Sequence, residues 1–244
     1  MSAVRTARER VRAELIREIT ETARRQLATA GAGGLSLRAV ARELGMVSSA
    51  IYRYVPSRDD LLTALIIDGY NAIGAAVERA DARHAKAHTG DFAGRWLAVC
   101  RAVREWALAH PHEYALLYGS PVPGYEAPDD TVPAAVRDTV VIARIVTEAH
   151  AAGAIDPDAP DGPDVPCPPP LPSIAGGLDR VRTIVHMDAP DDVIMRAVTA
   201  WAGLYGTVSF EVFGQYDNLI GDSSRADYFD HTMTLLGRLI GLKP

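Results

Sequence analysis

The residues best suited to contact another molecule lie close together between Ser48 and Arg58, in the stretch SSAIYRYVPSR. Small and hydroxyl-bearing residues open the stretch, two tyrosines and an arginine follow, and Pro56 interrupts it. Hydroxyl, phenol and guanidinium groups form hydrogen bonds with phosphate oxygens and with base edges. Because proline disfavours helical geometry in the residue before it, we expect a short helix that ends ahead of Pro56. This order of residues suits a surface that meets DNA.

The elements that position this stretch follow from the spacing of apolar residues. A long amphipathic first helix is predicted by apolar side chains that recur every four residues, at Val11, Leu15, Ile19, Ala23 and Leu27. Glycines at 31, 33 and 34 close it, and Ser36 then stands where a helix N-cap belongs. The helix LRAVAREL ends at Gly45, and a third short helix runs from Ser48 to Tyr54. A long helix, a tight turn and two short helices predict a helix-turn-helix.

Charge is divided unevenly along the chain. The net charge is −6, but the first 60 residues carry eleven arginines against seven acids, which gives +4 and leaves −10 for the remainder. A basic head on an acidic body is typical of a protein whose head binds nucleic acid. Chance segregation of surface charge is the alternative explanation.

The third helix has the side chains that a recognition helix needs. Its first residues are small, which suits entry into a major groove, while Ile51 and Val55 are expected to turn inward to a small core. Arg58 opens the next helix, where it is expected to face a flanking phosphate. The candidate DNA-binding residues are Arg38, Ser48, Ser49, Ala50, Tyr52, Arg53, Tyr54 and Arg58.

The stretch LSLRAVARELGMVSSAIYRYVPSRDDLLTALI resembles the DNA-binding head of the TetR family of bacterial transcriptional regulators. The resemblance covers about residues 8–66 and rests on a block of fixed spacing, made by Tyr52, Tyr54, Val55, Ser57, Arg58, Asp59 and Leu61. Two residues depart from the pattern. Val47 stands where the family often has a serine cap, which would pass the cap to Ser48, and Arg58 replaces the usual lysine.

The resemblance implies an all-α homodimer that represses transcription by occupying a palindromic operator on double-stranded DNA. It implies a helix-turn-helix DNA-binding domain, placed at residues 1–56, and a ligand-sensing and dimerisation domain at residues 57–244. The expected partners are operator DNA, a small-molecule effector and a second copy of the chain, with no cofactor.

The remainder of the chain also has helical spacing. Ser57 and Asp60 predict an acidic capping box at the start of a long helix. Further helices are expected at 91–110, 111–119, 131–152, 190–213 and 225–242. Residues 156–172 hold eight of the sixteen prolines and are interpreted as an extended or disordered connector. No segment alternates with period two, so the predicted fold is all-α.

Aromatic residues in the second domain are candidates for lining an effector cavity. The candidate ligand-binding residues are Trp96, Cys100, Trp106, His110, Tyr114, Tyr118, Trp201 and Tyr205. Arg95, Arg101, Arg104 and Glu105 are expected on the opposite, solvent-facing side of their helix. A cavity lined in this way favours a largely apolar effector. The alternative is that these aromatic residues simply pack the core.

Residues 197–210, AVTAWAGLYGTVSF, are apolar nearly all round and require burial on most sides. With LLGRLIGL near the C-terminus they suit a four-helix dimer interface, although an entirely intramolecular core has the same pattern.

Other classes of function lack support in the sequence. The motifs of serine hydrolases, zinc proteases and phosphate-binding loops do not occur, so we expect no catalytic site and no enzyme. His84 and His88 have a metal-like spacing but lie in a polar stretch, and no metal site is expected. Two cysteines, no signal peptide and no expected membrane span favour the cytoplasm. A ligand-responsive repressor remains the main hypothesis, against a small-molecule binding protein that has lost DNA recognition.

Overall fold

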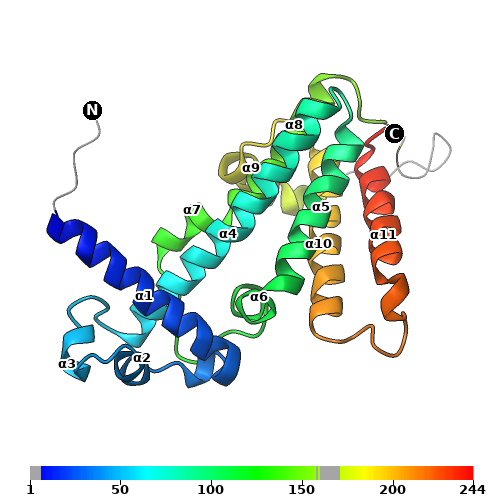
Figure 1. Ribbon diagram of the computed structural model, residues 1–244. Helices are drawn as coiled ribbons and strands as arrows, with labels where there is room; N and C mark the ends of the chain where they lie inside the picture. Colours follow the sequence, from blue (N-terminus) through cyan, green and yellow to red (C-terminus); the bar gives the residue numbers. More distant parts are fainter. Residues whose placement is uncertain (1–6, 158, 160–170, 244) are drawn as a thin grey trace. The chain divides into compact units, whose positions relative to one another are not determined.

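The computed structural model describes residues 7–157, 159 and 171–243. Within these residues the regular structure is helical, and the β pairing consists of one isolated antiparallel bridge between Ile155 and Leu242. The α-helices of the described chain are α1 (Ala7–Ala30), α2 (Leu37–Glu43), α3 (Ser48–Ile51), α4 (Arg58–Ala87), α5 (Phe92–Ala109), α6 (Pro111–Tyr118), α7 (Val132–Ala135), α8 (Arg137–Ala151), α9 (Ala175–Val185), α10 (Asp191–Val212) and α11 (Arg225–Ile240) (Figure 1). The prediction of an all-α fold is confirmed.

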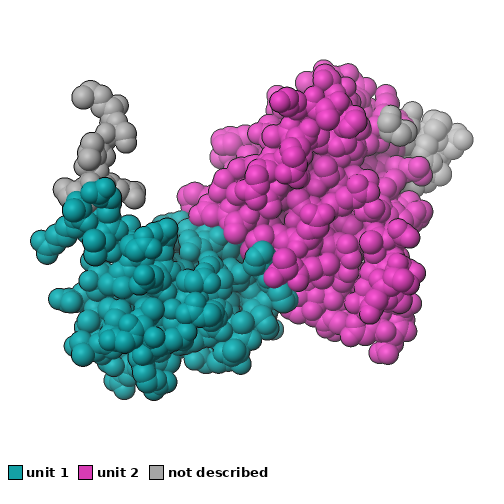
Figure 2. All heavy atoms as spheres, viewed as in Figure 1, with its two compact units in different colours: residues 1–70, 110–132 teal, residues 71–109, 133–244 magenta. Residues whose placement is uncertain are grey.

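Contacts divide the chain into two compact units, which Figure 2 shows in different colours. Unit 1 comprises residues 1–70 and 110–132, and unit 2 comprises residues 71–109 and 133–244. Helix α4 therefore contributes to both units, and α6 belongs with the head although it is distant from it in sequence. The boundary expected after residue 56 was placed at the end of the helix-turn-helix motif. The two compact units are instead defined by contacts between residues, and unit 1 continues to residue 70.

The core of unit 1 explains why it extends past residue 56. Ile19 of α1, Val40 of α2 and Ile51 of α3 are fully buried in one cluster together with Leu61 and Leu62 of α4. Burial of a side chain of this size stabilises a fold by about 1.5–3 kcal/mol. Because two of the five come from α4, the start of that helix is part of the head.

Side-chain caps define where the helices of the head begin. The Ser36 hydroxyl accepts a hydrogen bond from the backbone amide of Ala39 at 3.4 Å, and the Ser57 hydroxyl accepts one from the amide of Asp60 at 3.0 Å. Both predicted N-caps are confirmed. The suggestion that Ser48 caps α3 is wrong, since Val47 occupies the N-cap position without a side-chain cap bond and Ser48 is the first helical residue.

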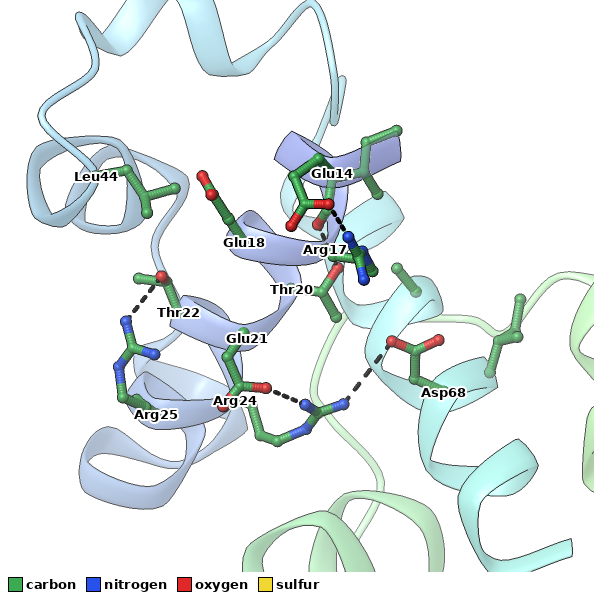
Figure 3. Close-up of a pocket in the computed structure, with 13 residues that line it drawn as sticks. Glu14, Arg17, Glu18, Thr20, Glu21, Thr22, Arg24, Arg25, Leu44 and Asp68 are labelled. Carbon is green, nitrogen blue, oxygen red and sulfur yellow. Dashed lines mark hydrogen bonds and ion pairs between the residues drawn. The ribbon is translucent and has the colours of Figure 1, made fainter. Parts of the chain in front are cut away.

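Helix α6 is joined to α1 within unit 1 by an ion pair. Arg24 Nε lies 2.8 Å from Glu113 Oε2, and the Glu113 side chain is almost wholly buried. Figure 3 shows the same Arg24 side chain between Glu21 and Asp68. One arginine therefore links α1 with α6 and with the first part of α4.

Unit 2 is a helical bundle built from the second part of α4 with α5, α8, α9, α10 and α11. Helices α5, α10 and α11 lie side by side (Figure 1). Its core combines the large side chains of Trp96 and Phe229 with smaller apolar residues, which include Ile73, Val77, Val99, Val146, Ile194, Leu204 and Met233.

Of the arginines expected to face solvent, Arg95 is buried in unit 2 and Arg104 is half-buried there, which corrects that prediction. Arg95 Nε lies 2.7 Å from Asp81 Oδ1 of α4, and Arg104 Nη2 lies 2.6 Å from Glu211 Oε1 of α10. Burial alone would raise the pKa of Asp81, but hydrogen bonds from Arg95 and Arg144 outweigh it and hold that pKa below its ordinary value. Helical periodicity predicted that these arginines lie on the side of α5 opposite its aromatic residues. That side of α5 is also covered, by α4 and α10.

The segment between α8 and α10 differs most from expectation. The predicted helix over 131–152 is interrupted at Val136, between α7 and α8, and α9 had not been predicted. Most of the proline-rich segment 156–172 lies outside the described residues. At its start, the amide of Asp156 donates to the carbonyl of Gly241 at 2.7 Å, which joins this segment to the end of α11.

Helix α4 is long and apolar enough to cross a membrane by length and composition alone, with a mean hydropathy of 1.3 over its most apolar window. Of that window, 44% is buried inside the protein. A core helix of a soluble protein has the same properties, so this feature is weak evidence for a membrane.

Candidate functional site

The candidate recognition surface is formed by α2, α3 and the turn that follows α3. Gly45 adopts a φ of 66°, which allows the chain to reverse between α2 and α3 without the strain a side chain would cause. α3 itself is a single turn, and residues 52–54 continue as a turn rather than as helix. Ile51 and Val55 are buried as predicted, so they anchor the segment from below.

The structure leaves most of the candidate DNA-binding side chains accessible. Arg38, Ser48, Ser49, Tyr52 and Arg53 are exposed. Tyr52 has 42% of its surface accessible, a large exposure for an aromatic residue. The remaining three candidates are half-buried: Ala50, Tyr54 and Arg58.

Arg58 makes contacts that the sequence did not indicate. Its Nη2 donates to the carbonyl of Ala32 at 2.8 Å and its Nε donates to the carbonyl of Leu35 at 3.3 Å. Both carbonyls lie in the connection between α1 and α2. A contact of Arg58 with DNA phosphate stays a prediction. Two nitrogens of its guanidinium group already donate hydrogen bonds within the head.

Tyr54 is held by a residue outside the predicted set. The Arg12 guanidinium lies over the Tyr54 ring, 5.4 Å from its centroid, and Arg12 Nη1 donates to the carbonyl of Arg53 at 3.2 Å. Arg12 lies near the start of α1, 41 positions before Arg53 in the chain, and only the fold brings it to the recognition turn. The charge excess of the N-terminal segment is the one sequence signal that pointed to it.

The candidate ligand-binding residues of unit 2 are mostly packed into its core. Trp96 is 1% exposed and its Nε1 donates to the carbonyl of Met233 at 2.8 Å, while Cys100 is fully buried. Burial raises the pKa of the Cys100 thiol well above its ordinary value, which disfavours the reactive thiolate. Trp106 is buried as well.

The candidates of unit 1 form an aromatic cluster. Tyr118 packs edge-to-face on Tyr70 of α4 with ring centroids 5.9 Å apart, and its ring lies 4.9 Å from that of Tyr114. Tyr114 is fully buried, whereas His110 is exposed at the N-cap of α6. These contacts pack α6 on α4, and a role of the three residues in ligand binding stays a prediction.

An apolar cavity of about 180 Å³ lies between α8, α9 and α10 in unit 2. Trp201 lines it, and is the candidate that the sequence had identified. The other lining residues are Thr139, Ile142, Val181, Ile184, Val185, Met187, Ala197 and Val198. They were missed because α9 was not predicted, although its apolar residues have helical spacing. We refer to this space as the α9 cavity.

Polar groups of two candidates lie beside the α9 cavity. The Trp201 ring packs 5.6 Å from that of Tyr205, and the Tyr205 hydroxyl donates a hydrogen bond to Asp138. Asp138 is 2% exposed, and burial raises its pKa despite that hydrogen bond. Trp201 Nε1 is buried and has no hydrogen-bond partner in the described part of the protein.

The histidine pair at the end of α4 makes a local contact. His84 Nε2 lies 2.8 Å from Asp91 Oδ2, and the rings of His84 and His88 are 4.8 Å apart. Within the described ranges, no group of three or more histidine, cysteine, aspartate or glutamate side chains is arranged to hold a metal ion.

A three-helix head with an exposed tyrosine–arginine turn, carried by a helical bundle, defines a helix-turn-helix protein of the kind that binds duplex DNA. Residues 19–65 match the family described as bacterial regulatory proteins, tetR family, and residues 96–236 match the tetracyclin repressor-like C-terminal domain. The chain belongs to the TetR family of bacterial transcriptional regulators.

Relatives extend this similarity over most of the chain. The HTH-type transcriptional regulators Mb1846 of Mycobacterium bovis and Rv1816 of Mycobacterium tuberculosis are each 46% identical over 216 residues, covering 87% of this chain and 85% of theirs. The crystal structure of the regulatory protein SCO4313 superimposes with a TM-score of 0.72 at 35% identity, over 95% of this chain and 98% of that one. The family and these relatives are regulators, which confirms that the protein is not an enzyme.

Proposed function

We propose that the protein is a ligand-responsive repressor that binds a palindromic operator as a homodimer in the cytoplasm and leaves it when a largely apolar small molecule binds. The recognition turn carries this proposal. Tyr52 and Arg53 are exposed directly beside the fully buried Ile51, so long polar side chains project from a rigid apolar support. Such a support is suited to hold base-contacting groups in a major groove.

A second copy of the chain is proposed to cover the outer face of α10 and α11. On α10, Ala202, Gly206 and Phe210 recur every four residues and are all exposed. A Cβ at Gly206 would meet no atom within 4 Å, so this position leaves room for a partner helix. On α11, Tyr228 and Leu235 are exposed and stand seven residues apart, which also places them on one helix face.

The symmetry of such a dimer supports the palindromic operator. Two chains that pack through the same helices are related by a two-fold axis. Two recognition turns related by that axis meet two half-sites of opposite direction, which together form a palindrome.

The α9 cavity supports an apolar effector. Its lining is carbon-rich, and its volume of about 180 Å³ is comparable to engineered cavities of about 150 Å³ that bind benzene. Helix α4 contributes to both compact units, so we expect it to carry the effect of the ligand to the head. A ligand shifts the protein only through its different affinity for the two conformations.

Binding to the DNA upstream of the protein's own coding sequence tests the proposal. The full-length protein is titrated against that fragment and against random DNA of equal length, at 50 and 200 mM salt. A protein that makes six or more phosphate contacts loses affinity by about a thousandfold between these salt concentrations. Absence of binding to both fragments would contradict the proposal and favour a small-molecule binding protein without DNA recognition.

A further inference from the structure

A surface groove of about 510 Å³ lies where the first turns of α1 meet the recognition turn, within unit 1. Arg8, Arg12 and Arg53 supply three guanidinium groups to it. Ala7, Val11 and Tyr54 complete the lining. We call this space the arginine groove. Two of its lining residues, Arg53 and Tyr54, directly follow Tyr52 in the sequence, and the other four belong to α1. None of the predicted DNA-binding residues lies in α1.

The arginines of α1 fall into two groups. Farther along the helix, each has a carboxylate partner: Arg17 pairs with Glu14, Arg24 with Glu21 and Glu113, and Arg25 with Glu43. Figure 3 shows the first two of these side chains directed at acidic groups of the head. Near the groove the described carboxylates form no ion pair with Arg8, Arg12 or Arg53. Among the described residues, the positive charge of the groove therefore has no ion-pair partner.

Arg12 is held in position before any ligand arrives. Its Nη1 donates to the carbonyl of Arg53 at 3.2 Å and its guanidinium lies over the Tyr54 ring. These contacts use one edge of a group that has five N–H donors, so donors remain for an anion. A guanidinium that is already fixed loses little side-chain entropy when it binds a tetrahedral anion with two parallel hydrogen bonds.

We propose that the arginine groove binds a backbone phosphate of duplex DNA, with Arg8 and Arg12 as the principal cationic ligands. The inference rests on the proposed DNA binding and adds a contact from α1 to it. Because Arg12 also contacts Arg53 and Tyr54, a phosphate bound here anchors the recognition turn to the DNA backbone. Phosphate contacts of this kind position a protein on the duplex and carry no sequence information themselves.

The test compares three single variants of the full-length protein: Arg8→Gln, Arg12→Gln and Arg10→Gln. Arg10 is the matched control, because it is an exposed arginine of the same turn of α1 that does not line the groove. Each variant is titrated against random DNA and the upstream fragment over a range of salt concentrations, and its thermal unfolding is recorded. Arg8→Gln removes no hydrogen bond or ion pair found within the described chain, so it is expected to fold normally.

The expected result is that Arg8→Gln and Arg12→Gln reduce the slope of log K against log salt by about one and weaken binding to both DNAs equally. Arg10→Gln keeps nearly the wild-type slope. Equal slopes for Arg8→Gln and Arg10→Gln, with the wild type binding DNA, would overturn the phosphate site alone. Failure of the wild type to bind any DNA would instead overturn the proposed function.

Discussion

Arg58 Nη2 donates a hydrogen bond to the carbonyl of Ala32 at 2.8 Å, so the first residue of α4 holds the connection that follows α1. A second bond, from Nε to the carbonyl of Leu35, closes the fork. Hydrogen bonds from charged groups contribute about 1.5–3 kcal/mol each when well shielded, and less for a side chain that is one-third exposed. Arg58 therefore supports the geometry of the whole head.

Replacing Arg58 by alanine is expected to lower the free energy of unfolding by about 1–3 kcal/mol and to weaken binding to operator and random DNA equally. Arg58→Lys separates two explanations, since it keeps the charge but cannot make the fork. If the fork matters, urea unfolding shows Arg58→Lys to be nearly as unstable as Arg58→Ala. A lysine variant with wild-type stability and wild-type DNA binding would show that only the charge is needed, as in a phosphate contact.

The exposed tyrosine of the recognition turn is expected to distinguish between DNA sequences. Tyr52→Ala should cost about 1–3 kcal/mol of binding to the upstream fragment and change binding to random DNA little. Arg53→Ala should weaken both, because its side chain also lines the arginine groove, with a larger loss on the upstream fragment. Fluorescence anisotropy on both DNAs measures this, and equal losses for Tyr52→Ala would mean that it contacts no base.

A charge on the exposed face of α10 or α11 is expected to break the proposed dimer. Ala202→Glu and Leu235→Glu each place a carboxylate in the interface, where it would lose its hydration without a partner. Leu236 is unsuitable because it packs against Gly203 in the same chain. Light scattering should show monomers for both variants. Thr234→Glu, an exposed neighbour on α11, serves as control, and dimers in all three would place the interface elsewhere.

Filling the α9 cavity is expected to remove effector binding. Val181→Phe puts a ring into the space, while Thr183→Phe makes a change of nearly equal size at an exposed position of the same helix. Toluene and indole serve as probes of benzene-like size. At a hundred times its dissociation constant, a bound probe stabilises the wild type by about 2.7 kcal/mol. The thermal shift should persist in Thr183→Phe and vanish in Val181→Phe; persistence in both would exclude this cavity.

Asp138 is expected to make stability depend on pH. Burial raises its folded pKa above the ordinary value of 3.8, so the folded state binds the proton more tightly than the unfolded state. Its contribution to the free energy of unfolding therefore falls as pH rises from 3.8 to the raised pKa, and is lowest above it. Asp138→Asn should be more stable than the wild type at pH 7, and the difference should shrink towards pH 4. A constant difference across that range would contradict the assignment to Asp138.

Local sequence was sufficient to predict much of the head. Ser36 and Ser57 could be recognised as caps because a cap needs only the residue and the amide three positions on, here Ala39 and Asp60. Burial of Ile51 followed from helical spacing alone. The same reasoning failed at α3, where Ser48 was suggested as the N-cap. The N-cap is Val47, and no side chain caps this helix.

The partners of long side chains were decided by tertiary structure. Arg104 was expected in solvent from its phase on α5, but it is half-buried and paired with Glu211, which is 107 positions away in the chain. Helical periodicity predicts on which side of a helix a residue lies. Which other helix packs against that side depends on the packing of the whole bundle. The α9 cavity and the contact of Arg12 with Tyr54 arise in the same way, from helices brought together by burial of apolar surface.

By itself, the sequence determined most of the helices, although not α9, and also the family and the recognition turn, because caps, glycine turns and apolar periods act within a few residues. Only the tertiary structure decided that α6 belongs with the head, that Arg58 holds the connection after α1, and that three arginines with no ion pair among the described residues surround one groove. Ion pairs and cavities form between segments far apart in the chain, and their free energy depends on distance and burial that no local pattern contains.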